Sequence, residues 1–499
     1  MECADQATLW RRFSFKRLTQ IINGYLLRKI NMSPINIVHI AILGDSLTDR
    51  GTMDHRYLFD LIPMSFLSGL AGHSPYGRFT NGFTWSDFLS AMLADEFIIN
   101  ILKNKYGLDD TDIADAVLSH DPHAEKLLFK AYSLDNDRFV QFEGQDFIRC
   151  YDEGGLSAHD YKWVPSTSIK CFFSRLILST LEAKREALLA YDEAHELSRK
   201  HKEETLIIEW SGANDLITVN PEPSEVEADL AVKARLKNAE ILIKNGYHHF
   251  ILFNLPDLSL TPRFQNMTGE EGEIARQNAH ECCAYFNEEL EKGVERLRAI
   301  YPHTNIDVFD VSSVFSEVYN NPEQHGFDKD KIKQPYVTSS DFKIEKNGSS
   351  PAPGYMFWDD VHPSATMHAK LVEYGYRKFK FDYKFSAPQV EVIQEKELTI
   401  SEEELRASFI IKYGEVLKAK KGGFFGCHHG SKFNYKAASL EEILSQVFEK
   451  KDSFTRDVIT DLQWIDKKGN LYLNIPALKE AMGQLEFNSL TMDQLIMDN

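Results

Sequence analysis

Four short hydrophobic runs divide the first 310 or so residues, and each ends at a cluster of polar or turn-forming residues. They are INIVHIAIL, ETLIIEW, HHFILFNL and NIDVFDV, which begin at residues 35, 204, 248 and 305. Each run is rich in β-branched or aromatic residues and ends at a turn or polar cluster, which is typical of buried strands in a parallel sheet. We therefore expect these four runs to form the centre of the fold.

Long amphipathic stretches separate the later runs. DLAVKARLKNAEILIKNG begins at residue 229, and EIARQNAHECCAYFNEELEKGVERLRAIYP begins at residue 273. Strands alternating with helices predict an α/β fold, a three-layer α/β/α doubly wound parallel sheet. In such sheets ligands bind beyond the carboxyl ends of the strands, so polar residues at those ends are the candidates for chemistry.

Three intervals depart from this alternation, and they set the expected domain boundaries around a main domain at residues 35–385. Residues 92–148 are acidic and helix-like, which predicts an insertion over the strand ends and a candidate lid. Residues 386–499 carry charged amphipathic stretches without buried strands, which predicts a smaller, mainly helical C-terminal domain of unknown role. Residues 1–34 alternate basic and hydrophobic positions, so this segment either packs on the main domain or makes peripheral contact with an anionic membrane.

Charge excludes one class of partner. The 499-residue chain has a formal net charge of -19, and phosphate recognition usually needs a basic face, so we expect no nucleic-acid partner. The six cysteines form no CxxC pair, which suits reduced thiols in a cytosol-like compartment. The run GCHHGSKF around Cys427 lacks a second ligand cluster at zinc spacing, so we expect no metal.

Localisation follows from the hydrophobic runs. No run reaches membrane-spanning length, and the first residues lack the uninterrupted apolar core of a signal peptide. We expect a cytoplasmic protein, or one exported without a cleaved signal peptide, including delivery into a host cell as a bacterial effector.

The first candidate for chemistry is Ser46, in LGDSLTD directly after the first run. Gly, Asp and Ser are common turn formers, so the stretch alone favours a turn, with Asp45 and Asp49 shaping it and the following helix start. A serine hydroxyl becomes a nucleophile only when an imidazole accepts its proton, and the imidazole needs an acceptor on its other nitrogen. The question is therefore whether such partners follow.

The partners occur at later strand ends, in a workable order. SGAND follows the second run and contains Asn214, whose amide can donate toward a developing oxyanion. DDVHP, near residue 360, places Asp359 and His362 three residues apart on one loop, so a short turn can supply the base and its orienting group. Alone, His362 would be a helix-start histidine followed by Pro363 as the first helical residue, and Asp360 an ordinary helix cap.

In its ordered motifs the chain resembles the SGNH or GDSL hydrolases. GDSLTD, GAND and DDVHP match three blocks of that family, and LPDLSLTP and SPYGRFTNGFTWSDFLSAML resemble segments of its bacterial phospholipase and acyltransferase branch. That branch includes thermolabile haemolysins and glycerophospholipid:cholesterol acyltransferases. The resemblance covers about residues 35 to 380 and implies the SGNH hydrolase fold.

The resemblance also implies roles for individual residues. Ser46 would be the nucleophile, His362 the base, Asp359 its orienting carboxylate, and the amides of Ser46 and Asn214 oxyanion donors. The remaining donor in the family is a second-block glycine, usually in a sequence like NxAxGGA. The best match here is CYDEGGLSAHDY, which nominates Gly155, with Gly154 second; Cys150 and Asp152 replace the usual asparagine and alanine.

The implied function is cleavage of acyl esters of phospholipids or lysophospholipids through an acyl-serine, without a cofactor. Transfer of the acyl group to an alcohol instead of water would make the protein an acyltransferase, and the sequence leaves that choice open. Two alternatives also stay open: a carbohydrate O-deacetylase, and a catalytically silent SGNH-fold binding protein that acts through its C-terminal domain. A protein partner for that domain is not identified.

Overall fold

The computed structural model describes residues 34–388, apart from residues 109, 120–131, 133, 135, 167 and 221, and two short strands near the C-terminus. These two strands, β11 (Trp464–Ile465) and β12 (Leu471–Tyr472), form an antiparallel pair. The rest of the predicted C-terminal domain beyond residue 388, the cluster around Cys427 and the N-terminal segment up to residue 33 lie outside the described residues. In the described part, no helix is long and apolar enough to cross a membrane.

A six-stranded sheet forms the centre, in the order β5-β6-β2-β7-β8-β9. Five of its strands are parallel, and β5 pairs antiparallel with β6 at one edge. The four predicted runs are all present in it. The strands are β2 (His39–Gly44), β5 (Phe139–Phe142), β6 (Gln145–Asp152), β7 (Thr205–Trp210), β8 (His249–Phe253) and β9 (Asn305–Phe309).

Strand β2 lies where the strand order reverses. The next parallel strand in the chain, β6, pairs with one side of β2, and β7 then crosses back to pair with the other side. Such a switch point opens a crevice at the carboxyl ends of the strands. Ser46 stands two residues beyond the end of β2, so the topology places it at this crevice.

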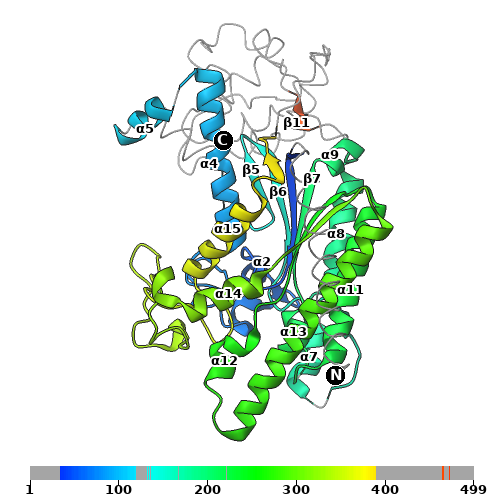
Figure 1. Ribbon diagram of the computed structural model, residues 1–499, viewed down its shortest axis with the longest axis vertical. Coiled ribbons are helices and arrows are strands. Elements are labelled where there is room, and N and C mark those ends of the chain that lie inside the picture. The colour runs from blue at the N-terminus through cyan, green and yellow to red at the C-terminus, as the bar shows by residue number, and fades with distance from the viewer. Residues whose placement is uncertain are drawn as a thin grey trace, which may run out of the picture.

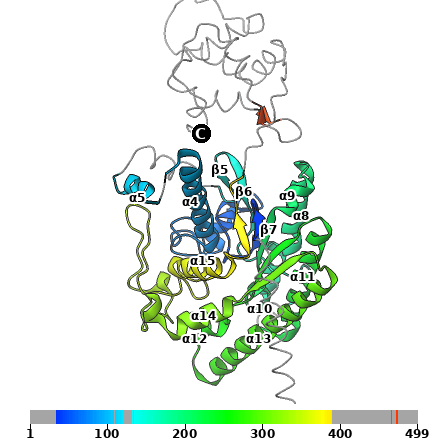
Figure 2. The ribbon, with the colours of Figure 1, turned by 45° about the horizontal axis from the view of Figure 1, so that its top comes forward.

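Helices cover both faces of the sheet, as predicted for a three-layer fold (Figures 1 and 2). Because successive strand residues point to opposite faces, Ile40 and Ile42 of β2 join one hydrophobic cluster and Ala41 and Leu43 join the other. The first cluster lies against α4 (Trp85–Tyr106), α14 (Val311–Asn320) and α15 (Ala365–Phe379); the second lies against α8 (Leu181–Ala194), α11 (Glu225–Lys244) and α13 (Gly269–Ile300).

The prediction of an insertion over residues 92–148 is wrong at both ends of that interval. Helix α4 continues through the first part of the interval, and the buried Leu93, Phe97 and Leu102 of this helix belong to the core. The last part contains β5 and the first half of β6, which are strands of the central sheet. Only α5 (Asp110–Leu118) and the residues around it, several of them outside the described residues, are left of the predicted insertion.

Strand β6 was not predicted because charged residues interrupt its hydrophobic pattern. Its sequence is QDFIRCYD, and Arg149 in its middle is buried. The guanidinium of Arg149 pairs with the carboxylate of Asp192 on α8 at 3.1 Å and donates to the hydroxyl of Tyr247 at 3.2 Å. A buried cation is tolerated here because it is paired and hydrogen-bonded, a property that no local pattern reveals.

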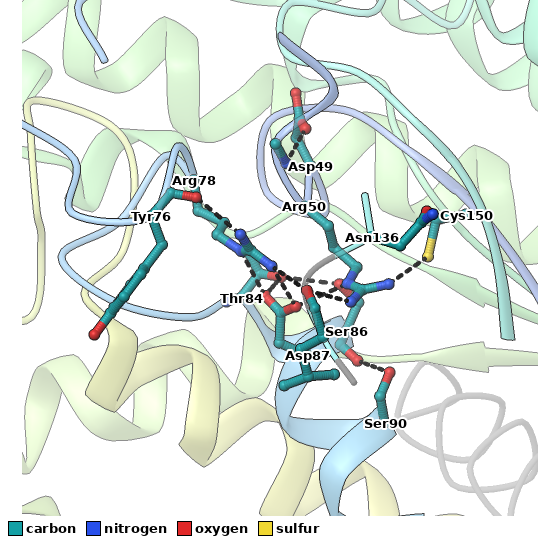
Figure 3. A network of polar contacts seen from close by, with 12 residues as sticks. Asp49, Arg50, Tyr76, Arg78, Thr84, Ser86, Asp87, Ser90, Asn136 and Cys150 are labelled. Atoms are coloured by element: carbon teal, nitrogen blue, oxygen red, sulfur yellow. Dashed lines mark hydrogen bonds and ion pairs between the residues drawn. The ribbon is translucent and has the colours of Figure 1, made fainter. Parts of the chain in front are cut away.

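A buried ionic network fixes the start of α4 against the turn that follows β2 (Figure 3). The Asp87 carboxylate accepts from Arg50 Nε at 2.7 Å and from Arg78 Nε and Nη2 at 3.1 and 3.0 Å. It also accepts the backbone N–H of Thr84, the N-cap residue of α4, at 3.0 Å. The network therefore joins the segment GRFTNG, which contains Arg78, to the loop that carries Ser46.

The charge of Asp87 depends on its two arginines. Burial opposes the ionised carboxylate, but the positive charges of Arg50 and Arg78 and their hydrogen bonds outweigh burial and lower the pKa of Asp87 to about 2. The two arginines contact both oxygens of the carboxylate, so neither charge is left unpaired inside the domain.

Asp87→Asn should lower the free energy of unfolding by about 3 to 5 kcal/mol, because it leaves two buried guanidinium groups without their counter-charge. Urea denaturation followed by circular dichroism measures this. Because the folded-state pKa lies below the ordinary value of 3.8, the stabilisation is present above 3.8 and is lost as pH falls toward 2, so the difference between variant and wild type should shrink there.

The matched control is Asp229→Asn, which breaks an exposed pair with Lys233 at 2.8 Å on α11. Exposed pairs contribute about 0.5 kcal/mol or less, so this variant should resemble the wild type. Equal effects of the two substitutions would contradict the role assigned to Asp87.

Candidate active site

A tight turn after β2 presents Ser46 at the edge of the sheet. The Asp45 carbonyl accepts the N–H groups of Thr48 and Asp49 at 3.0 Å each, and the Asp45 carboxylate accepts the N–H of Leu47 at 3.0 Å. The turn requires glycine at residue 44, because a Cβ there would lie 2.5 Å from the Thr48 hydroxyl oxygen. Asp45 is therefore a turn-shaping residue, as the sequence predicted.

The loop before α15 brings its imidazole to that serine. His362 Nε2 lies 2.7 Å from Ser46 Oγ, and His362 Nδ1 lies 2.7 Å from Asp359 Oδ2. The other carboxylate oxygen of Asp359 accepts the backbone N–H groups of Val361 and His362 at 2.8 and 2.6 Å. The structure thus brings together the three residues that the sequence nominated, in one continuous chain of hydrogen bonds.

Asp359 and His362 each stabilise the charged form of the other. Burial disfavours ionisation of Asp359, but the adjacent imidazole and the hydrogen bonds from His362 and Val361 outweigh it, so the pKa of Asp359 lies below its ordinary value. Burial likewise disfavours protonated His362, but the charge of Asp359 and the hydrogen bond to it raise the pKa of the imidazole. Asp359 is therefore charged and accepts the Nδ1–H, which leaves Nε2 to accept the proton of Ser46.

The predicted start of α15 is wrong, and so is the capping role of Asp360. Helix α15 begins at Ala365, and Ser364 is its N-cap residue, with its hydroxyl accepting the N–H of Met367. Pro363 therefore precedes the helix. Asp360 lies four residues before that cap and faces another element.

Asp360 is held by Arg263, a residue that the sequence did not nominate. Arg263 lies on α12 (Pro262–Gln265), at the end of the LPDLSLTP segment. Its backbone N–H donates to the Asp360 carbonyl at 2.8 Å, and its guanidinium donates to both carboxylate oxygens at 2.7 and 3.3 Å. This clamp holds the loop that carries Asp359 and His362. The two residues are 97 positions apart, so spacing gave no signal of it.

The carboxylate of Asp49 organises the neighbouring loop. It accepts the N–H groups of Gly51 at 2.8 Å, Thr52 at 2.6 Å and Met53 at 3.1 Å, at the start of α2 (Thr52–His55). It also accepts the N–H of Gly154 at 2.6 Å, from the loop after β6. The predicted structural role of Asp49 is confirmed, and its long-range bond to Gly154 is an addition.

That bond decides between the two glycines. The N–H of Gly154 is committed to Asp49 and cannot serve an oxyanion, whereas the N–H of Gly155 has no hydrogen-bond partner among the described residues. Gly155 has a φ of +77°, and a Cβ there would lie 2.7 Å from Leu178, so glycine is required. The geometry thus favours Gly155.

Asn214 lies beside this loop, on α10 (Ala213–Ile217). Its Nδ2 donates to the carbonyl of Leu156, the residue after Gly155, at 3.0 Å, and its Oδ1 accepts from the Thr218 hydroxyl at 2.6 Å. An amide has two N–H bonds, so the second one is available to a ligand. The backbone N–H of Ser46 is likewise without a partner in the described residues.

The sequence matches the GDSL-like lipase/acylhydrolase family model over residues 156–374. It is 24% identical over 342 residues to the secreted effector protein SseJ of Salmonella typhimurium, covering 68% of this chain and 62% of that protein. It is 25% identical over 224 residues to the phosphatidylcholine-sterol acyltransferase of Aeromonas hydrophila, covering 37% of this chain and 64% of that protein.

A third relative is the thermolabile hemolysin of Vibrio parahaemolyticus, 29% identical over 183 residues, with 32% of this chain and 38% of that protein covered. The chain therefore spans less than two thirds of the length of each of these three relatives. The matched region contains the helix of Asn214 and the loop of Asp359 and His362. The turn of Ser46, which follows β2, lies before that region and completes the site. Residues 156–374 therefore carry the match to the GDSL-like lipase/acylhydrolase family, and the three named relatives agree with it.

Proposed function

We propose that the protein is a serine ester hydrolase that cleaves acyl esters of phospholipids or lysophospholipids through an acyl-serine intermediate. The observation that carries the proposal is the chain of 2.7 Å contacts from Ser46 Oγ through His362 to Asp359 at the switch point of the sheet. The lipid substrate class is supported by the names of the relatives, which include an acyltransferase for phosphatidylcholine and sterol and a hemolysin.

The geometry accounts for each step of such a reaction. Nε2 of His362 accepts the proton of Ser46 as Oγ attacks the ester carbonyl, and Asp359 stabilises the imidazolium that forms. The N–H groups of Ser46, Gly155 and Asn214 are the donors available to the tetrahedral oxyanion. His362 then protonates the leaving alcohol, and the acyl group stays on Ser46.

Water or a second alcohol completes the cycle. His362 removes a proton from water, which attacks the acyl-serine, and fatty acid leaves as Ser46 regains its proton. An alcohol in place of water would receive the acyl chain, and the acyltransferase named among the relatives supports this second activity. The intact hydrogen-bond chain argues against a catalytically silent binding protein, and no relative among those named points to carbohydrate.

We also propose that the protein is exported. The relative named as a secreted effector supports a protein that leaves the cell that makes it, including delivery into a host cell.

Ser46→Ala should abolish labelling by a fluorophosphonate probe and lower kcat for ester cleavage by about 10⁶-fold, because no other hydroxyl replaces the nucleophile. The assay is a lipid panel in which free fatty acid and transferred acyl product are measured together. Ser119→Ala, at an exposed serine just after α5, is the matched control and should behave as wild type. Labelling that persists in the folded Ser46 variant would refute the proposal.

Asp359→Asn should lower kcat by about 10⁴-fold, because the imidazole loses the group that fixes its tautomer. The base must be unprotonated to work, so activity rises with pH through the pKa of His362, which Asp359 raises. The acidic limb of the pH profile, measured with a soluble ester, should therefore move to lower pH in the variant.

Asp360→Asn is the comparison for that variant. Asp360 also raises the pKa of His362, but by less than Asp359 does, so the limb should move in the same direction by a smaller amount. An acidic limb that stays in place in Asp359→Asn would contradict the assignment of His362 as the base.

Asn214→Ala should lower kcat by about 10² to 10³-fold with a smaller change in KM, because an oxyanion donor acts in the transition state. Thr218→Val is the control, since it removes the hydrogen bond that supports Asn214 Oδ1 but keeps the donor. Equal losses in the two variants would show that Asn214 matters only for packing.

A further inference from the structure

Large hydrophobic side chains protrude from a hairpin near the active site. The hairpin consists of β3 (Tyr57–Leu58) and β4 (Ile62–Pro63), and α3 (Met64–Leu67) follows it. Phe59 and Leu61 at its tip are each 80% exposed, and Phe66 on α3 is 76% exposed. Exposed apolar groups are common singly, but a contiguous cluster marks an interaction surface.

The backbone at the hairpin tip is strained. Phe59 and Asp60 have φ angles of 53° and 57°, in the left-handed region that an aromatic residue rarely adopts. Asparagine or glycine would suit the turn better, so the fold tolerates strain in order to present a phenyl ring to the outside.

A second protruding group lies on the loop before α7 (Ile169–Ile177) and on that helix. Trp163 is 76% exposed and also has a positive φ, of 65°. Ile169 and Phe173 are 76% and 55% exposed and lie on one face of α7, while Cys171 and Arg175 on the other face are buried. An exposed aromatic ring in a left-handed conformation thus occurs in both groups.

The two groups are joined to each other. Arg56, just before the hairpin, donates from Nη2 to the carbonyl of Ile177, the last residue of α7, at 2.6 Å. Its Nη1 pairs with the carboxylate of Glu153, next to Gly154. Helices α2 and α7 accordingly lie at the same end of the sheet, opposite α9 (Arg199–Glu203), which precedes β7 (Figure 1).

Both groups also flank the catalytic residues. Leu58 of the hairpin and Leu178 after α7 pack in one hydrophobic cluster with Phe79 and Trp358. The rings of Phe79 and Trp358 have centroids 4.9 and 6.3 Å from that of His362. The hairpin and the end of α7 therefore pack against the hydrophobic cluster that contacts His362.

The charge of this region departs from that of the chain. The whole protein has a net charge of -19, yet the exposed charged residues between 161 and 178 are Lys162 and Lys170, and this stretch contains no acidic residue. The hairpin and α3, residues 57–67, carry only Asp60 as a charged group. Apolar and aromatic side chains flanked by exposed lysines match the boundary between acyl chains and phosphate headgroups.

We propose that residues 57–67, 162–166 and 168–173 form a docking surface for a phospholipid bilayer, and that docking places the active site on the lipid. The inference rests on the proposed function, since the ester that Ser46 would attack is part of that bilayer. A protein partner would not need to straddle the catalytic entrance, whereas an enzyme that draws its substrate from a membrane does.

The test uses the full chain with Phe59→Asn and Trp163→Asn together. Asparagine adopts positive φ readily, so the fold should be retained or stabilised while both rings are lost. Binding is measured by co-sedimentation with vesicles of phosphatidylcholine, with and without phosphatidylserine, in the Ser46→Ala background so that the lipid is not degraded. We expect binding to fall about tenfold or more.

Ile300→Asn is the matched control. Ile300 is 63% exposed at the end of α13, just before β9 begins. It therefore lies at the amino ends of the parallel strands, away from the catalytic residues at their carboxyl ends. Its substitution should leave vesicle binding as in the parent protein. Parent protein that does not bind vesicles, or a double variant that binds as well as the parent, would overturn the docking surface.

Measuring ester cleavage distinguishes a failure of the docking surface from a failure of the lipid hydrolase activity. With Ser46 intact, the double substitution should lower fatty acid release from vesicles at least about tenfold more than cleavage of a soluble short-chain ester. Equal losses on both substrates would overturn the docking role. Vesicle binding that depends on Phe59 and Trp163, in a protein that releases no fatty acid, would support docking and refute the lipid hydrolase.

Discussion

The carboxylate of Asp49 is the group on which the geometry of the active site depends. It accepts four backbone N–H groups, three from the start of α2 and one from Gly154. The loops that follow β2 and β6 are thereby joined, although they are about a hundred residues apart in sequence. The next residue, Gly155, has a left-handed conformation, and its N–H is unpaired within the described structure.

The buried aspartates around the site differ in pKa because their surroundings differ. Burial raises the pKa of Asp45 to about 7 and also raises that of Asp49, since their partners are neutral N–H groups. Burial acts on Asp87 and Asp359 as well, but neighbouring arginines or the imidazole outweigh it and lower the pKa. The pKa of each of these buried carboxylates therefore depends on the groups that face it, because the residue type is the same in all four.

The strands, their order in the chain and the catalytic loop were readable from local patterns. Four of the five parallel strands are mostly hydrophobic, so their burial in the sheet can be predicted from consecutive residues. The spacing of Asp359 and His362 predicts their contact because three residues of one loop cannot hold them far apart. Ser46 follows directly from the end of its strand, where the topology of parallel sheets puts reactive groups.

What the patterns missed depends on contacts between distant segments. Strand β6 resembled part of an insertion because Arg149 and its flanking aspartates interrupt the hydrophobic run. That arginine is tolerated inside because it pairs with Asp192 on α8 and donates to Tyr247. Likewise, the partner of Asp360 is Arg263, and the choice of Gly155 over Gly154 follows from a bond to Asp49. The helices and strands could be predicted from the sequence because the hydrophobic pattern of each segment shows which of its residues are buried. The pairing of buried charges and the hydrogen bonds of single N–H groups could not be predicted, because they form only when folding brings remote segments together.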